Sequence, residues 1–311
     1  MLVSVVLTNL NEEQTVKEFI NRCVASLNKV KDEFGFDSEI IFVDDRSKDA
    51  SPEIIREEIE KDKRIRLLQM TRQMGRDICF FAGLRASKGD VVFIMDSDLQ
   101  DPPEMFSQLI RVWRDRQVDV VNTHMVRRHG ETLYKRIMLK ISYRILAKSF
   151  PFKYSIDCGN FKLLSRRAVD EIVRSKEVDP YFRPYTDWLG FKQAYVPFER
   201  SPRFAGETHF SLGSTRSYLE FFRAWTHFSY FPLHLPFFMG TLFLLGAVAS
   251  VVSMISDFTQ TAAMLSVVCL GFSALFYIVW LFGFYLRQVH TATRNRPGYI
   301  VNEAVNIESH Y

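Results

Sequence analysis

Apolar and polar residues alternate in blocks along the first 125 positions of the chain. Apolar blocks at 2–8, 39–44, 64–70, 90–96 and 119–125 have the length of buried strands. The segments between them carry apolar residues at helical spacing, beginning with a helix predicted over 9–34. Strands that alternate with helices predict an α/β domain with a mostly parallel sheet, covered by helices on both faces.

A different pattern follows, because no Asp, Glu, Lys or Arg occurs from Ala224 to Ser256 or from Phe258 to Leu286. Within these stretches, Phe237–Ile255 and Met264–Leu286 are each long enough to cross a hydrocarbon core of ~30 Å at ~1.5 Å per residue. A pair of buried helices in a soluble core is the alternative. The lack of a polar face favours a two-helix transmembrane hairpin.

Arginines flank both predicted spans, at Arg216, Arg223, Arg287, Arg294 and Arg296. By the positive-inside rule, the α/β domain and both termini face the cytoplasm, and the chain is a multi-pass protein of the cell (inner) membrane. The predicted organisation is an α/β domain at 1–213, an amphipathic juxtamembrane segment at 214–232, two transmembrane helices at 233–286 and a cytoplasmic tail at 287–311.

The composition bears on nucleic-acid binding and on the state of the cysteines. The formal net charge of +4 is too small to indicate a nucleic-acid partner, so none is expected. The four cysteines show no C-x-x-C spacing, which favours free thiols over disulfides or a zinc site.

Polar clusters follow three of the predicted strands, at Thr8–Glu12, Asp44–Asp45 and Asp96–Gln100. In sheets of this kind ligands bind at the carboxyl ends of strands, although ordinary solvated loops are the alternative. The pair Asp96 and Asp98 places two carboxylates where a divalent cation and a diphosphate can meet. An acidic pair alone is a weak signal, but the setting of strand, "DSDLQDPPE" and helix is a specific one.

Eight motifs occur in order: "SVVLTNLNEE", "VDDRSKD", "RQMGRDICFFAGL", "MDSDLQDPPE", "IDCGNFKLLSRRAV", "DWLGFKQAYV", "RFAGETHFS" and "NRPGYIVNE". With them the chain resembles family-2 glycosyltransferases with the Rossmann-like GT-A fold. The resemblance is to the polyisoprenyl-phosphate group, which includes dolichyl-phosphate mannose synthases and GtrB-like enzymes. It implies inverting transfer of a hexose from a nucleotide sugar to polyprenyl (undecaprenyl) phosphate, with Mg²⁺ or Mn²⁺ as cofactor.

The resemblance also implies roles for individual residues. Asp96, Asp98 and Asp157 would be catalytic, and Asp98 with Gln100 would bind the metal. The nucleotide sugar would be bound by Thr8, Leu10, Glu12, Asp45, Asp96, Ser97, Trp188 and Arg203. Leu10 stands where an aromatic residue is frequent, and Asp187 with Trp188 would border the sugar.

The role of Asp157 is open on chemical grounds. The second pKa of a phosphate monoester lies near ~6, so the acceptor oxygen is largely ionised at neutral pH. A base would then add little, and positioning with charge stabilisation would dominate. Asp157 could therefore be a base, could orient the acceptor or a sugar hydroxyl, or could be a structural acid.

The acceptor side has a signature of its own. Basic residues at Arg136, Lys140, Arg144 and Lys148 adjoin apolar ones at Leu133, Ile137, Ile141 and Ile145. This pattern predicts a helix at a membrane surface, with a solvated charged helix as the alternative. The residues expected to hold the acceptor phosphate are Arg127, Arg128, Arg136 and Lys140, while Met125 stands where relatives tend to carry arginine.

The remaining expectations concern substrates and partners. UDP-glucose is the preferred donor, with another UDP-sugar or GDP-mannose open. A processive polysaccharide synthase is disfavoured because no Q-x-x-R-W motif occurs and two spans are too few for a channel. A non-catalytic membrane scaffold is the non-enzymatic alternative. The tail containing "GYIV" implies, by resemblance, pairing between subunits of a homo-oligomer, a tetramer.

Overall fold

The structure is a computed structural model. It describes residues 1–127, 133–155, 158–175, 181–199, 215–229, 260–293 and 299–307, with separate positions between 231 and 245. The chain divides into two compact units. The first contains 1–141, 152–211 and 296–311, and the second contains 142–151 and 212–295.

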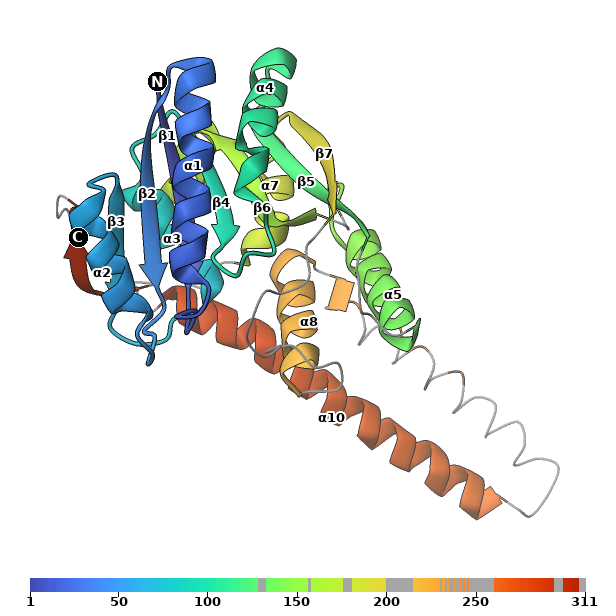
Figure 1. Cartoon of the computed structure of the whole chain (residues 1–311). Helices are drawn as coiled ribbons and strands as arrows, with labels where there is room; N and C mark the ends of the chain where they lie inside the picture. Colours follow the sequence, from blue (N-terminus) through green and yellow to red (C-terminus); the bar gives the residue numbers. More distant parts are fainter. Residues whose placement is uncertain are drawn as a thin grey trace. The chain divides into compact units, whose positions relative to one another are not determined.

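The first unit is built on an eight-stranded sheet with the order β7-β5-β6-β4-β1-β2-β3-β8 (Figure 1). Its strands are β1 (Leu2–Asn9), β2 (Asp37–Asp44), β3 (Ile65–Met70), β4 (Val91–Asp96), β5 (Val120–Arg127), β6 (Cys158–Ser165), β7 (Gln193–Glu199) and β8 (Val301–Val305). The run β4-β1-β2-β3 is parallel, as is β5-β7. Strands β6 and β8 pair antiparallel to all their neighbours. The α/β fold is therefore confirmed, with a mixed sheet.

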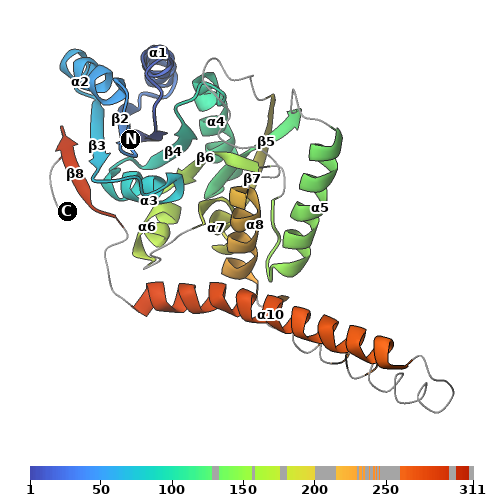
Figure 2. The same cartoon turned by 90° about the horizontal axis from the view of Figure 1, so that it is seen from below.

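Helices cover both faces of this sheet (Figure 2). One face packs against α1 (Val16–Phe34), α2 (Ser51–Lys61) and α4 (Phe106–Arg116), which follows the short helix η1 (Pro103–Met105). The other face packs against α3 (Arg76–Ala86), α6 (Arg166–Arg174) and α7 (Phe182–Trp188). Helix α3 lies so close to β1 and β2 that a Cβ at Gly83 would clash with Val6 and Val43. Glycine is required there for contact between helix and sheet.

One predicted helix start is corrected. The helix expected over 9–34 begins at Val16, because Asn11 has a φ of 55° and the segment before Val16 forms a turn on Glu12. Helix α2 begins at Ser51, and Ala50 occupies its capping position. The Ser51 hydroxyl accepts a hydrogen bond from the Glu12 backbone N–H at 2.9 Å. A serine that could cap its own helix thus fixes the loop after β1.

In the second unit, α8 (Thr215–Phe228) packs against α10 (Gln260–Thr293). The ring centroids of Phe222 and Trp280 are 5.1 Å apart with their planes nearly perpendicular. The Tyr285 hydroxyl donates to the Ser229 carbonyl oxygen at 2.7 Å, and this oxygen lies just beyond the end of α8. Aromatic packing, this part-buried hydrogen bond and a second one from the Gln288 amide to the Thr226 hydroxyl at 3.2 Å together hold the helix pair.

Helix α10 contains an apolar stretch, Leu270–His290, with a mean hydropathy of 1.5. Among the described residues it is the one helix long and apolar enough to cross a membrane. Its large apolar side chains are exposed, with Leu270 at 64% and Tyr277 at 73%. The second predicted span, Met264–Leu286, lies within this helix. The first, Phe237–Ile255, falls almost wholly outside the described residues, so the hairpin and the multi-pass topology stay predictions.

Candidate functional site

Three of the predicted polar clusters meet at one edge of the sheet. Strand β1 lies between β2 and β4 and runs parallel to both, so their carboxyl ends coincide. The register places Thr8 beside Asp96, and the Thr8 hydroxyl donates to Asp96 Oδ1 at 2.9 Å. Ser97 follows and donates its hydroxyl to the Thr8 carbonyl oxygen at 2.9 Å. The structure thus brings together residues that are almost ninety positions apart in sequence.

The two aspartates after β2 have different surroundings. Asp44 is fully buried and accepts hydrogen bonds from the side chains of Asn9 (3.1 Å) and Gln69 (3.2 Å). Asp45 accepts the backbone N–H groups of Met74 (2.6 Å) and Gly75 (3.0 Å). Burial raises the pKa of Asp45 above its usual value, although these hydrogen bonds oppose the shift. Asp44 therefore fixes the strand ends, and Asp45 fixes the loop that leads into α3.

The "DSDLQ" loop is held in a strained conformation. Leu99 has a φ of 60°, a left-handed value that is uncommon for a residue with a Cβ. Its side chain is only 3% exposed and belongs to the hydrophobic core. The neighbouring Asp98 accepts the Gln100 backbone N–H at 3.1 Å. Burial of Leu99 offsets the strain and turns the backbone so that Asp98 is presented at a fixed place.

The "DSDLQ" loop contains oxygen atoms that could serve as ligands for a divalent cation. Within the described ranges, no group of three or more His, Cys, Asp and Glu side chains could hold a metal. Mg²⁺ needs no such cage, because it is usually held by one or two carboxylates together with substrate phosphates. Asp98, only 8% exposed and next to Asp96, fits this partial ligand set, with the Gln100 amide oxygen close in sequence.

Arg76 is a candidate site residue that the sequence did not single out. It is the first residue of α3 and follows Gly75, whose φ is 98°. Its guanidinium Nη1 lies 3.6 Å from Asp96 Oδ2, and the side chain is 48% exposed. The signal in the sequence was a basic residue directly after a glycine at a helix start. Arg76 places a positive charge where a diphosphate could also reach it.

The remaining predicted site residues lie in loops or at the ends of elements, except for three that fall outside the described residues. Arg128, Asp157 and Arg203 lie outside the described residues. Leu10 follows β1, and Glu12 lies in the same loop, where its carboxylate accepts the Thr15 hydroxyl at 3.0 Å. Trp188 ends α7 and is half-exposed. Arg127 is the last residue of β5.

The predicted basic and apolar stripes lie on α5 (Leu133–Ser149). The apolar residues Ile137, Ile141 and Ile145 are exposed, at 49%, 49% and 40%. Arg144 and Lys148 are exposed as well, whereas the side chains of Arg136 and Lys140 lie outside the described part of the helix. An exposed apolar row is unusual for a solvated helix and fits a helix that meets a membrane surface.

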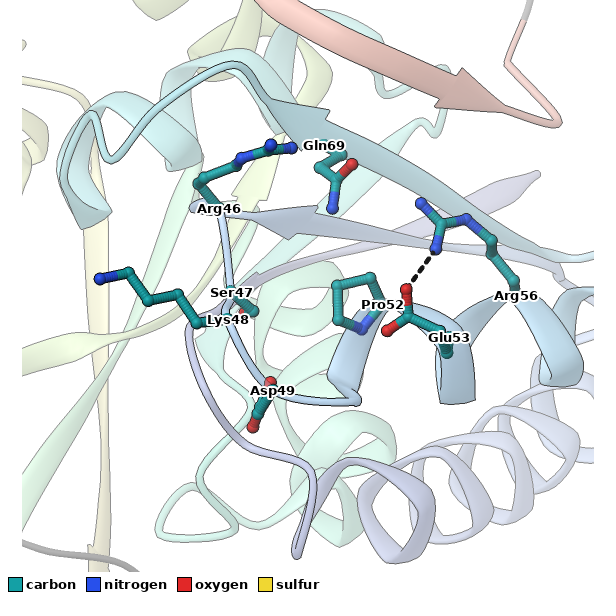
Figure 3. Close-up of a pocket in the computed structure, with 8 residues that line it drawn as sticks. All are labelled: Arg46, Ser47, Lys48, Asp49, Pro52, Glu53, Arg56 and Gln69. Carbon is teal, nitrogen blue, oxygen red and sulfur yellow. Dashed lines mark hydrogen bonds and ion pairs between the residues drawn. The ribbon is translucent and has the colours of Figure 1, made fainter.

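An open pocket of about 510 Å³ adjoins the end of β2 (Figure 3). It is lined by Arg46, Ser47, Lys48, Asp49, Pro52, Glu53, Arg56 and Gln69. Arg56 bonds Glu53 at 3.1 Å, the contact drawn in Figure 3, and Glu303 of β8 at 2.6 Å. None of the residues predicted to bind nucleotide sugar is among these eight. The pocket therefore borders the predicted site without containing its carboxylates.

The chain is similar in sequence to known glycosyltransferases. The family model described as "Glycosyl transferase family 2" matches residues 4–173. The chain is 33% identical to "Uncharacterized glycosyltransferase YkcC" of Bacillus subtilis (strain 168), over 98% of this chain and 95% of that protein. It is 29% identical to "Prophage bactoprenol glucosyl transferase homolog" of Escherichia coli (strain K12), over 97% and 98%. It is 28% identical to "SfII prophage-derived bactoprenol glucosyl transferase" of Shigella flexneri, over 98% of both.

Two solved structures are similar in fold. Staphylococcus aureus TarS 1-349 in complex with UDP gives a TM-score of 0.48 at 16% identity, over 73% of this chain and 64% of that one. Mannosyltransferase PcManGT from Pyrobaculum calidifontis, in complex with GDP-Man and Mn²⁺, gives 0.45 at 15% identity, over 94% and 75%.

Proposed function

The chain belongs to glycosyl transferase family 2, and from this premise we propose that it transfers a hexose to a polyprenyl phosphate at the cytoplasmic face of the cell membrane. The observation that carries the proposal is the similarity to bactoprenol glucosyl transferases over 97–98% of the chain, α10 included. UDP-glucose is the donor that we prefer, in keeping with the word glucosyl in those names. Another UDP-sugar or GDP-mannose is the alternative donor.

The donor would lie across the carboxyl ends of β1, β2 and β4. We assign nucleotide-sugar binding to Thr8, Leu10, Glu12, Asp45, Asp96, Ser97, Trp188 and Arg203. Thr8 holds the Asp96 carboxylate by its hydroxyl, and Arg76 faces the other oxygen of that carboxylate. Asp98 and Gln100 would hold Mg²⁺ or Mn²⁺, which when bound offsets negative charge on the departing diphosphate. Arg76 adds a fixed positive charge on the same side.

The acceptor needs orientation more than deprotonation. A phosphate monoester with a second pKa near ~6 is largely a dianion at neutral pH, so its oxygen is already nucleophilic. Basic residues at the end of β5 and on α5, including Arg127, Arg128, Arg136 and Lys140, would hold it near the lipid surface. Asp157 would then orient the acceptor or a sugar hydroxyl rather than remove a proton.

The test of this function is product analysis. Purified full-length protein in lipid nanodiscs is incubated with undecaprenyl phosphate, Mg²⁺ and, in turn, UDP-glucose, UDP-galactose, UDP-N-acetylglucosamine or GDP-mannose, and the lipids are analysed by mass spectrometry. One hexose on undecaprenyl phosphate is the expected product. Polymeric products would support a processive synthase, and donor binding without any lipid product would support a non-catalytic scaffold. Either result contradicts the proposal.

Replacing both Arg144 and Lys148 by Gln should raise the KM for undecaprenyl phosphate at least about tenfold. Charge-assisted hydrogen bonds contribute ~1.5–3 kcal/mol where well placed, and tenfold corresponds to ~1.4 kcal/mol. The KM for the nucleotide sugar should change less than about twofold. Steady-state kinetics with each substrate varied in turn measures both values.

The matched control for this pair is on α1, where Lys17 and Lys29 are also exposed. Changing these two lysines to Gln removes the same charge and should leave both KM values unchanged. If the α5 variant weakened both substrates equally, the stripe would serve folding or general membrane attachment instead.

A further inference from the structure

A buried lysine lies in the sheet next to the strand that carries the carboxylates. Lys162 on β6 is 1% exposed and stands between Ile94 of β4 and Asn122 of β5 in the register. Its ammonium donates to the Thr186 hydroxyl at 2.8 Å. An ammonium without a counter-charge is very costly inside a protein. The residues around Lys162 must therefore supply a negative charge, or the ammonium must lose its proton.

The next residue of α7, Asp187, supplies that charge. Asp187 is 7% exposed, and it opposes the effect of burial, which lowers the pKa of Lys162 to about 8. Arg183 of the same helix also contributes to lowering this pKa, while Cys158 on β6 opposes the shift. The nearest partners on the flanking strands, Ile94 and Asn122, carry no charge. Asp187 thus places a negative charge near the buried ammonium of Lys162.

Asp187 has a second set of partners on the chain that enters β6. The Ser155 backbone N–H donates to its carboxylate at 2.8 Å, and the Ser155 hydroxyl does so at 3.1 Å. The same hydroxyl lies 2.8 Å from the Tyr195 hydroxyl on β7. Tyr195 in turn donates to the Gln193 side-chain oxygen at 3.3 Å, and Asn122 donates to that oxygen at 2.6 Å. One carboxylate therefore anchors Ser155 to a network that joins α7, β5 and β7.

Ser155 lies close in sequence to the edge of the sheet where the substrate would bind. Strand β6 runs antiparallel to β4, with Val91 opposite Ser165 and Ile94 opposite Lys162. The start of β6 consequently lies at the end of β4 that carries Asp96. Ser155 is three residues before Cys158, the first residue of β6. The Ser155 carbonyl oxygen accepts the Cys158 backbone N–H at 3.4 Å, so fixing Ser155 also constrains the start of β6 at this edge.

We propose that Asp187 is a positioning residue for the transfer reaction: its carboxylate fixes Ser155, and Ser155 in turn fixes the first residue of β6 beside the substrate. The inference rests on the proposed function, since the segment is useful only if chemistry occurs at the β4 end. Asp187 acts through Ser155, and the proposal gives it no contact with the reacting atoms.

The test compares four variants of the full-length protein in nanodiscs. Asp187→Asn keeps the shape but removes the charge and one acceptor, so kcat should fall about tenfold or more while the KM for nucleotide sugar stays within about twofold. Asp119→Asn is the matched control, because Asp119 accepts the Ser165 hydroxyl at 2.9 Å at the other end of β6. It should leave kcat unchanged.

Lys162→Met and the double variant Lys162→Met with Asp187→Asn separate positioning from stability. The double variant contains no unpaired buried charge, so its melting temperature should recover relative to Asp187→Asn. Its kcat should stay low, because Ser155 still lacks the carboxylate. In the wild type kcat should fall as pH rises through about 8, where Lys162 loses its proton and Asp187 its counter-charge. This inflection should be absent from Lys162→Met.

Hydrogen exchange provides a readout that needs no turnover. Peptides that include Ser155 should exchange faster in Asp187→Asn than in the wild type, while peptides from β1 should not change. Unchanged exchange at Ser155, or a double variant with wild-type kcat, would overturn the positioning role. If the wild type forms no lipid product with any donor, the proposed function fails, and exchange alone still decides whether Asp187 anchors Ser155.

Discussion

Replacing Asp98 by Asn should lower kcat for lipid glycosylation by about 100-fold or more. The change keeps the side-chain shape and one oxygen, but it removes a negative charge from the place where a divalent cation would bind. A bound cation would stabilise the negative charge that builds up on the leaving diphosphate. Its loss should therefore destabilise the transition state more than the bound substrate. Chelation of the wild type should abolish transfer, and added Mg²⁺ or Mn²⁺ should restore it.

The control is Asp115→Asn near the C-terminal end of α4, where the side chain is 69% exposed. It should retain wild-type kcat and the wild-type response to metal. Full activity of Asp98→Asn in the presence of a chelator would show that transfer needs no divalent cation. It would also contradict the assignment of a metal site to "DSDLQ". Because Asp98 is nearly buried, circular dichroism should show that the variant remains folded before kcat is compared.

Replacing Arg76 by Met should raise the KM for the nucleotide sugar about 10- to 100-fold. A hydrogen bond to a charged group contributes ~1.5–3 kcal/mol, and the diphosphate would lose this contact while Asp96 would lose its cation. Binding of the free nucleoside should be almost unchanged, because it has no phosphate for the guanidinium to contact. Titration calorimetry with nucleoside and nucleoside diphosphate separates the two effects.

Arg85, the exposed arginine near the other end of α3, provides a matched control. Arg85→Met removes the same charge from the same helix and should leave both affinities intact. An equal loss of affinity for nucleoside and diphosphate in Arg76→Met would show that Arg76 supports the loop at Gly75 rather than the phosphates. Arg76→Lys should recover part of the affinity, since a point charge remains but the planar fork is lost.

The elements that the sequence predicted best are those whose whole pattern lies within one segment. Strand β4 is a run of buried apolar residues, and its boundaries follow from the Asp that ends it. Convergence of Thr8 with Asp96 was also predictable, because parallel neighbouring strands present their carboxyl ends together. The direction of β6 was not, because an antiparallel strand with both faces buried has the same apolar composition as a parallel one.

Residues whose role depends on partners far away in the sequence could not be predicted from the sequence alone. Lysine is rarely buried, so Lys162 within "NFKLLS" gives no sign of its burial until Asp187 and Thr186 are placed over it. The left-handed conformation of Leu99 depends in the same way on a core that the loop alone does not contain. Arg76 was visible only as one basic residue among many, and its position 3.6 Å from Asp96 arises from the packing of α3 on β1.

The pairing of β8 with β3 has a consequence for how the chain is made. Thr71 and Ile300, joined by a backbone hydrogen bond of 3.2 Å, are separated by more than two hundred residues, and α10 lies between them in sequence. During synthesis β3 therefore remains an open edge until the ribosome has completed the apolar helix and released the tail. Open edges pair readily with other chains. For this interval the edge of the nascent domain is exposed to such pairing, and the final strand closes it only after translation of the helix is finished.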